Sequence, residues 1–290
     1  MKRLATLALS LFSSLPVFAA GFKGSVAFDD ADRARHRQGL STILATAASC
    51  LESRHEEHLK FYRRHGISAF YGDRSSFGAM NVAQRRAHVA SLGKDPRLAD
   101  LMKPTSCVGL TRECLGAGFA AAGQSDLWQK IDAYTRANAF DGSAMQAALR
   151  ELGWSVFFWN PNLAKNAEWD EQEIRQHGAS SPARGWHAYR WLTVQKSGQY
   201  YFNAVDDARS FVNFGTRVPT RLARVPFFVG VAHTGYHVFP GTFGHVIEAH
   251  STRAITDPQT VESADFNPLA TGGAPRGQYR SGLLALPPGY

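Results

Sequence analysis

The chain has 290 residues and a formal net charge of +8 at pH 7. Hydrophobic residues make up 44% of it and aromatic residues 12%, which is typical of a packed core and excludes a chain that is disordered throughout. No run of Lys and Arg with interleaved aromatic residues indicates nucleic-acid binding, so the basic surplus suits an anionic envelope polymer or membrane surface, or only aids solubility.

The first nineteen residues have the three parts of a secretory signal peptide. Lys2 and Arg3 supply the positive end, an apolar run covers residues 4–12, and small residues precede a cleavage site after Ala19. The run is shorter than the ~20 residues of a membrane span, and no later segment approaches that length. We therefore expect a periplasmic or secreted protein whose mature chain, without Lys2 and Arg3, has a net charge of about +6.

Residues 20–104 are predicted to form a helical N-terminal segment that packs onto the later part of the chain. Asp29, Asp30 and Asp32 supply acids for the first turn of the first helix, and Asn81 to Leu92 is a second expected helix. Apolar residues of the first helix recur at helical spacing: Leu40, Ile43, Leu44, Ala47 and Leu51.

One stretch of this segment, His55-Glu56-Glu57-His58, has a superficial likeness to a zinc-protease motif. Its two histidines are three residues apart rather than four, and no third ligand is in view. We therefore interpret it as a solvated helix face and expect no metal site there.

Residues 105–290 are predicted to form a second unit, with helices first and strands afterwards. The expected helices cover 107–122, 125–137 and 143–152. The expected strands cover 154–159, 186–194, 199–205, 225–232, 233–239, 245–250 and 282–286, and residues 256–279 are expected to be a surface loop. Helices followed by an antiparallel sheet are typical of the α+β class.

The three cysteines are an odd number for an oxidising compartment, so at most two of them can pair. Cys107 follows Thr105 and Ser106, either of which can cap a helix, and this places its thiol in the first turn. Backbone N–H groups and the helix dipole stabilise a thiolate there, which favours a nucleophile over the alternative of a buried structural cysteine.

Cys114 lies two helical turns beyond Cys107, which separates their Cα atoms by about 10 Å and is too far for a disulfide. A bridge from Cys114 to Cys50 would instead attach the N-terminal helix to the helix that begins at Cys107, and would leave the Cys107 thiol outside any disulfide.

A histidine-rich pair of predicted strands supplies candidates for a general base. Strand alternation puts His233 and His237 on one face, and the returning strand offers Glu248 on one face and His245 on the other. A polar residue of this kind can orient an imidazole, as the third member of a catalytic triad does. The alternative is a set of surface histidines on a sheet edge.

At these residues the chain resembles the NlpC family of cell-wall cysteine peptidases. The sequence Ser106-Cys107-Val108-Gly109-Leu110 is similar to that family's Asp-Cys-Ser-Gly-Leu/Phe motif, and residues 233–235 and 246–249 resemble its two strands with the other catalytic residues. The resemblance implies a papain-like fold with Cys107 as nucleophile, His233 as base and Glu248 as orienting residue. It also implies cleavage of amide bonds in peptidoglycan stem peptides, with neither a metal nor an organic cofactor.

The chain departs from that family in two respects. Ser106 replaces the usual Asp, and an insertion at about residues 160–222 separates the motifs. Within the insertion His187 begins a predicted strand whose returning strand carries Asn203, so Cys107, His187 and Asn203 form a rival triad.

Two functions of other classes stay open at the sequence level. One is a non-catalytic envelope-binding protein on the same fold, and the other is a thiol acyltransferase or lipid hydrolase with the same triad.

Overall fold

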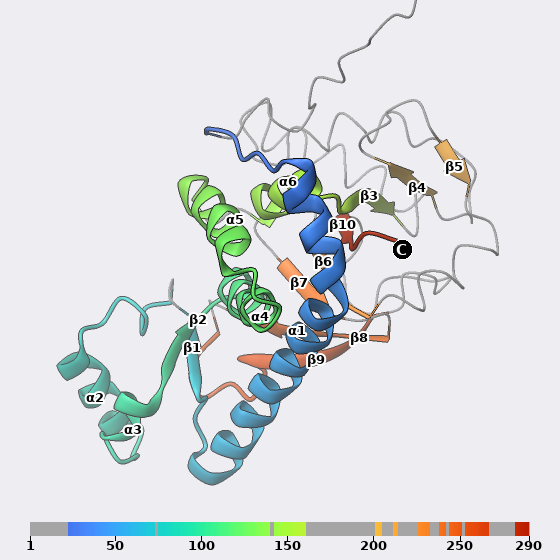
Figure 1. Ribbon diagram of the computed structural model, residues 1–290. Helices are drawn as coiled ribbons and strands as arrows, with labels where there is room; N and C mark the ends of the chain where they lie inside the picture. Colours follow the sequence, from blue (N-terminus) through green and yellow to red (C-terminus); the bar gives the residue numbers. More distant parts are fainter. Residues whose placement is uncertain are drawn as a thin grey trace, which may run out of the picture.

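The computed structural model describes residues 23–72, 75–139, 142–160, 201–204, 211–213, 226–232, 238–241, 244–250, 253–266 and 282–289. The predicted signal peptide and the predicted strand at 186–194 lie outside these residues. The described part combines helices with a large antiparallel sheet and a second, two-stranded one, which confirms the mixed helix-and-sheet class (Figure 1).

Four helices form the main helical layer. They are α1 (Asp30–His65), α4 (Cys107–Ala121), α5 (Ser125–Ala137) and α6 (Gly142–Glu151). The predictions for α4, α5 and α6 are correct to within about one residue. α1 continues well past the last predicted apolar position and ends at Gly66, whose φ of 67° is the left-handed conformation that glycine adopts without strain.

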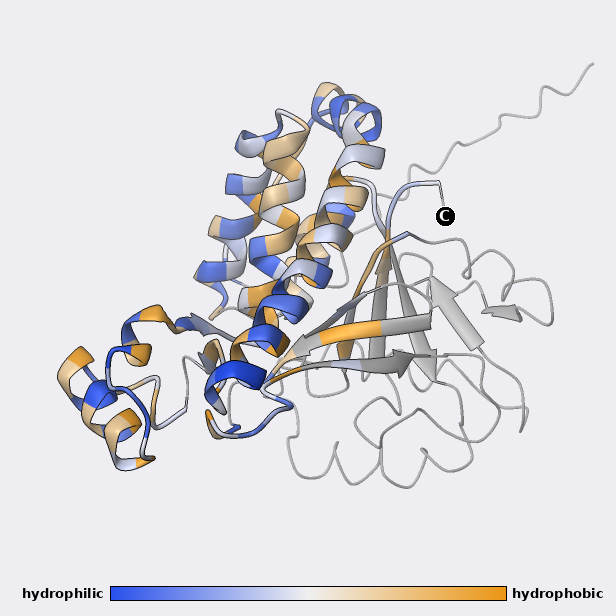
Figure 2. Cartoon of the chain, turned by 90° about the horizontal axis from the view of Figure 1, so that it is seen from below, coloured by the Kyte–Doolittle hydropathy of each residue, from blue (hydrophilic) through white to orange (hydrophobic). Residues whose placement is uncertain are grey.

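The large sheet has eight described strands in the order β5-β4-β3-β10-β6-β7-β8-β9, and all neighbours are antiparallel. The strands are β3 (Ser155–Asn160), β4 (Tyr201–Ala204), β5 (Phe211–Asn213), β6 (Phe228–Ala232), β7 (Val238–Gly241), β8 (Gly244–Ala249), β9 (Val261–Phe266) and β10 (Gly282–Leu286). Figure 2 shows the main helices packed together on one side of this sheet. α4 contacts β7 and β8, whereas α6 contacts β3, β6 and β10.

The prediction of a surface loop at 256–279 is wrong for residues 261–266. These residues form β9, which pairs with β8 from Ala249↔Val261 to Gly244↔Phe266. The segment's apolar residues, Val261, Ala264 and Phe266, do not alternate strictly with polar ones, so its own pattern is weak. The ladder to β8 and the burial of Val261 make it a strand.

A smaller lobe follows α1 and projects away from the main helices (Figures 1 and 2). Its elements are β1 (Phe70–Gly72), α2 (Val82–Ser91), α3 (Leu98–Leu101) and β2 (Lys103–Thr105). β1 and β2 pair in parallel, so a short strand that ends at Thr105 precedes Ser106 and Cys107. The lobe has its own hydrophobic core, to which Ile255 from the loop before β9 contributes.

The main core lies between the helical layer and the sheet. α1 and α4 make the most extensive helix–helix contact, and residues of both share one cluster with strands β6, β8, β9 and β10. α1 is therefore part of the same core as α4 and the sheet.

Candidate functional site

Cys107 is the first residue of α4, and a side-chain cap fixes where that helix begins. Ser106 has an extended backbone, and its hydroxyl accepts a hydrogen bond from the Gly109 N–H at 3.0 Å. This bond satisfies one of the donors that a helix start leaves without partners. The structure confirms the predicted helix start and identifies Ser106 as the cap. Cys107 thus belongs to the first turn of α4, whose backbone N–H groups point toward the helix start.

Cys107 packs at the edge of the main core rather than on the surface. Its side chain is 8% exposed, and its carbonyl oxygen accepts a hydrogen bond from the Thr111 hydroxyl at 2.8 Å. The preceding Thr105 is also buried. Little of the Cys107 side chain is therefore accessible to a reagent or substrate.

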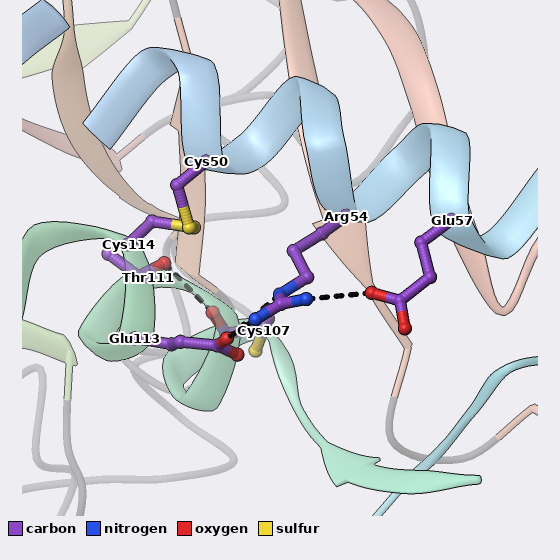
Figure 3. The surroundings of a disulfide bond; sticks show 7 residues. All are labelled: Cys50, Arg54, Glu57, Cys107, Thr111, Glu113 and Cys114. Atoms are coloured by element: carbon purple, nitrogen blue, oxygen red, sulfur yellow. Dashed lines mark hydrogen bonds and ion pairs between the residues drawn. A yellow bond between two sulfur atoms is a disulfide. The ribbon is translucent and has the colours of Figure 1, made fainter. Parts of the chain in front are cut away.

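All three cysteines lie in the described part of the chain, and two of them form a disulfide. Cys50 of α1 is bonded to Cys114 of α4, with a Cα–Cα distance of 5.3 Å (Figure 3). Cys107 is in no disulfide. The Cys50–Cys114 bridge is the one that the sequence left open as a possibility, and it forms where Cys114 faces α1.

A chain of four alternating charges joins α1 to α4 and to β2. Arg54 bonds Glu113 on α4 and Glu57 on α1, the latter at 2.7 Å (Figure 3). Lys103 bonds Glu57 at 2.8 Å. Burial opposes the charged form of Glu57, but the hydrogen bonds from Lys103 and Arg54 outweigh it and lower the pKa of this carboxyl. Glu57 therefore stays charged at neutral pH, and the four side chains hold α1 against the beginning of α4.

The other predicted catalytic residues are only partly covered by the structure. His233, His237 and His187 lie outside the described residues. The backbones of His245 and Glu248 belong to β8, and that of Asn203 belongs to β4.

β6 ends at Ala232, directly before His233, and β8 contacts the helix that begins with Cys107. The triad of Cys107, His233 and Glu248 stays a prediction.

The expectation of a solvated face at residues 55–58 is wrong for His58. Its side chain is fully buried, with Nε2 at 2.8 Å from the Pro258 carbonyl oxygen and Nδ1 at 3.1 Å from the Ser68 hydroxyl. A carbonyl only accepts, so Nε2 carries the hydrogen and Nδ1 accepts from Ser68. Burial lowers the pKa of His58, and the neutral ring connects α1 to the loop before β9.

The described residues hold no group of three or more His, Cys, Asp or Glu side chains that could bind a metal ion. Among the helices of the described ranges, none combines the length and the apolar character that crossing a bilayer requires. Comparisons with protein-family models, with curated proteins and with solved structures give no significant match.

Proposed function

We propose that this protein is an exported cysteine hydrolase that cleaves amide bonds in bacterial cell-wall peptides on a papain-like fold. One observation carries the proposal: of three cysteines, Cys107 alone is outside a disulfide, and it begins a capped helix that packs on β7 and β8. The disulfide supports export, because such bonds persist in the periplasm and outside the cell.

In the proposed mechanism the Cys107 thiolate attacks the amide carbonyl carbon. Backbone N–H groups in the first turn of α4 hold the resulting oxyanion. His233 as imidazolium protonates the leaving amine, and water then attacks the acyl-enzyme to release the acid and regenerate the thiol. Glu248 or His245 orients the imidazole.

Two neighbours on β8 compete for the orienting role. Ile247 and Ala249 belong to the core that α1 and α4 cover, and residues of one parity in a strand share a face. Position 245 has the same parity as Ile247 and Ala249, whereas position 248 has the opposite parity. His245→Ala and Glu248→Ala variants, assayed in parallel, decide which residue assists the base. The variant that lacks the assisting residue should lose at least ~10-fold in kcat.

The burial of Cys107 favours a second candidate, a non-catalytic envelope-binding protein in which the thiol is structural. The two candidates differ in the reactivity of the sulfur. A nucleophile reacts stoichiometrically with iodoacetamide near pH 6, whereas a structural thiol at 8% exposure stays unlabelled until the protein unfolds.

The direct test is digestion of purified peptidoglycan by the wild-type protein and by Cys107→Ala. We expect the wild type to release peptides and the variant to release none, and mass spectrometry of the products identifies the bond. His233→Ala and His187→Ala separate the two triads, because only the variant of the true base loses activity. Undiminished digestion by Cys107→Ala would falsify the proposal, and products that carry a transferred acyl group would favour an acyltransferase.

A further inference from the structure

A groove of about 460 Å³ runs between α4 and α5, outside the predicted triad. The two helices are joined by a short turn and run in opposite directions, so the last turn of α5 lies beside the first turns of α4. Gly109 lines the groove at that end, two residues after Cys107. Two residues span about 200° around a helix, so the groove reaches the turn that carries Cys107 on the opposite face of α4 from the buried thiol.

Two arginines share one carboxylate at this end of the groove. Asp132 of α5 accepts from Arg112 Nε at 2.5 Å through one oxygen and from Arg136 Nε at 2.7 Å through the other. Asp132 is 13% exposed and Arg136 is 61% exposed. These three side chains carry two positive charges and one negative charge, and the positive group on the solvent side is Arg136.

The binding capacity of Arg136 is only half used. Its Nε is held by Asp132, whereas its two terminal nitrogens make no hydrogen bond to the residues that the structure describes. A guanidinium fixed through Nε presents these nitrogens as a fork, which matches the two oxygens of a carboxylate.

Glu113, the other acidic residue that lines the groove, does not neutralise the positive charge of Arg136. Glu113 lines the groove, but its carboxylate is bonded by Arg54, which reaches it from α1 (Figure 3). Further along, the Trp128 indole forms a wall. It lies so close to Gly116 that a Cβ there would be 2.7 Å from its Nε1, so the helix surface under the indole is bare backbone.

We propose that this groove binds the part of the substrate that carries a free carboxylate, with Arg136 as the recognising residue and Trp128 as an apolar wall. The proposal rests on the proposed function for its substrate class, which is an acidic wall peptide. Asp132 is a positioning residue because it acts only through the two arginines.

The test measures binding without turnover, in the full chain with Cys107→Ala. The probes are a stem tetrapeptide that contains D-glutamate with its carboxylates free, and the same peptide with the carboxylates amidated. Isothermal titration calorimetry should show the free acid binding at least ~10-fold more tightly than the amide, as a charge-assisted pair predicts.

Substitutions then assign that preference to one residue. Arg136→Gln should abolish it and Arg136→Lys should keep part of it, because lysine supplies the charge without the fork. Arg63→Gln is the matched control, since it removes one exposed positive charge from α1 and should leave the preference unchanged. An equal preference in Arg136→Gln and its parent overturns the proposal, and so does equal binding of acid and amide.

The outcomes also separate this proposal from the proposed hydrolase. If the preference depends on Arg136 but the wild type cleaves no wall peptide, the groove site stands and the hydrolase fails. If the wild type cleaves the peptide while Arg136→Gln keeps the full preference, the hydrolase stands and the groove site fails.

Discussion

His36 is a buried side chain whose neutral form is held in place from several sides. Its Nε2 accepts a hydrogen bond from Trp154 Nε1 at 2.9 Å, and its ring stacks on Phe119 with the centroids 5.3 Å apart. Burial is the main cause that lowers the pKa of His36 to about 4; the nearby Gln124 side chain partly offsets this, and Arg37 adds to it.

The protein should lose stability in mild acid because of this histidine. The unfolded chain binds a proton near pH 6.5, whereas folded His36 binds one only near pH 4, so the loss begins below about pH 6.5 and is complete below about pH 4. A difference of this size corresponds to up to about 3 kcal/mol. Urea denaturation from pH 7 to pH 4 measures it.

The comparison variant is His36→Phe, which keeps a stacked ring but does not titrate. Its stability should depend less steeply on pH than that of the wild type, whatever its absolute value. Part of the dependence should remain, since burial also lowers the pKa of His58. An unchanged slope in the variant would contradict the assignment to His36.

At the scale of elements, the pair of α1 and α4 determines where Cys107 lies. The Cys50–Cys114 disulfide and the ion pair between Arg54 and Glu113 join the two helices. The two helices also approach closely at Gly118, where an added Cβ would collide with the Ile43 carbonyl group. That carbonyl is part of the α1 backbone, so it cannot rotate away as a side chain could.

Gly118→Ala should therefore force the two helices apart. We expect a loss of about 1–3 kcal/mol in the free energy of unfolding. This loss exceeds the gain of up to about 1 kcal/mol that alanine brings to a helix interior. Urea denaturation checks it, with Ala117→Ser on the exposed face of α4 as the control that changes stability by about 0.5 kcal/mol or less. A Gly118→Ala protein as stable as the wild type would show that the helices are not in close contact.

At the scale of the whole molecule, the loop before β9 connects the small lobe to α1. Ile255 is 3% exposed in the lobe's core, and its carbonyl oxygen accepts from the Ser68 N–H at 2.6 Å. Tyr62 and His58, both from α1, bond the carbonyl oxygens of Thr256 and Pro258. The lobe leads directly into Cys107 through β2, so its stability affects the candidate site.

Ile255→Ala should loosen the lobe while the rest of the fold persists. Removing this side chain from a packed core costs about 2–5 kcal/mol, and Ile255→Val, the conservative control, costs about 0.5–1.5 kcal/mol. Hydrogen exchange should show lost protection at the amides of β1 and α2, with α4 and α5 unchanged. Equal loss in α4 and α5 would show that the lobe and the main core unfold as one unit.

The local sequence around Cys107 was sufficient to predict its helix, its capping by Thr105 or Ser106, and the exclusion of Cys114 as its disulfide partner. These features depend on residues within about two helical turns, where helix geometry and capping chemistry leave few alternatives. The sequence allowed a bridge between Cys50 and Cys114, but only the structure shows that the two are bonded.

Other features could not be predicted, since they depend on segments that meet only in the folded chain. The burial of His58 comes from the Pro258 carbonyl and Ser68, and nothing in residues 55–58 indicates either partner. β9 is a strand because β8 pairs with it.

Sequence alone thus determined the helix that begins at Cys107, the division into helices and a later sheet, and the chemistry that a thiol in a first turn favours. These depend on periodicity and capping, which act over neighbouring residues. Only the tertiary structure decided that Arg112, Asp132 and Arg136 meet beside that turn, because two helices must fold back on each other before a distant guanidinium and carboxylate can share a groove.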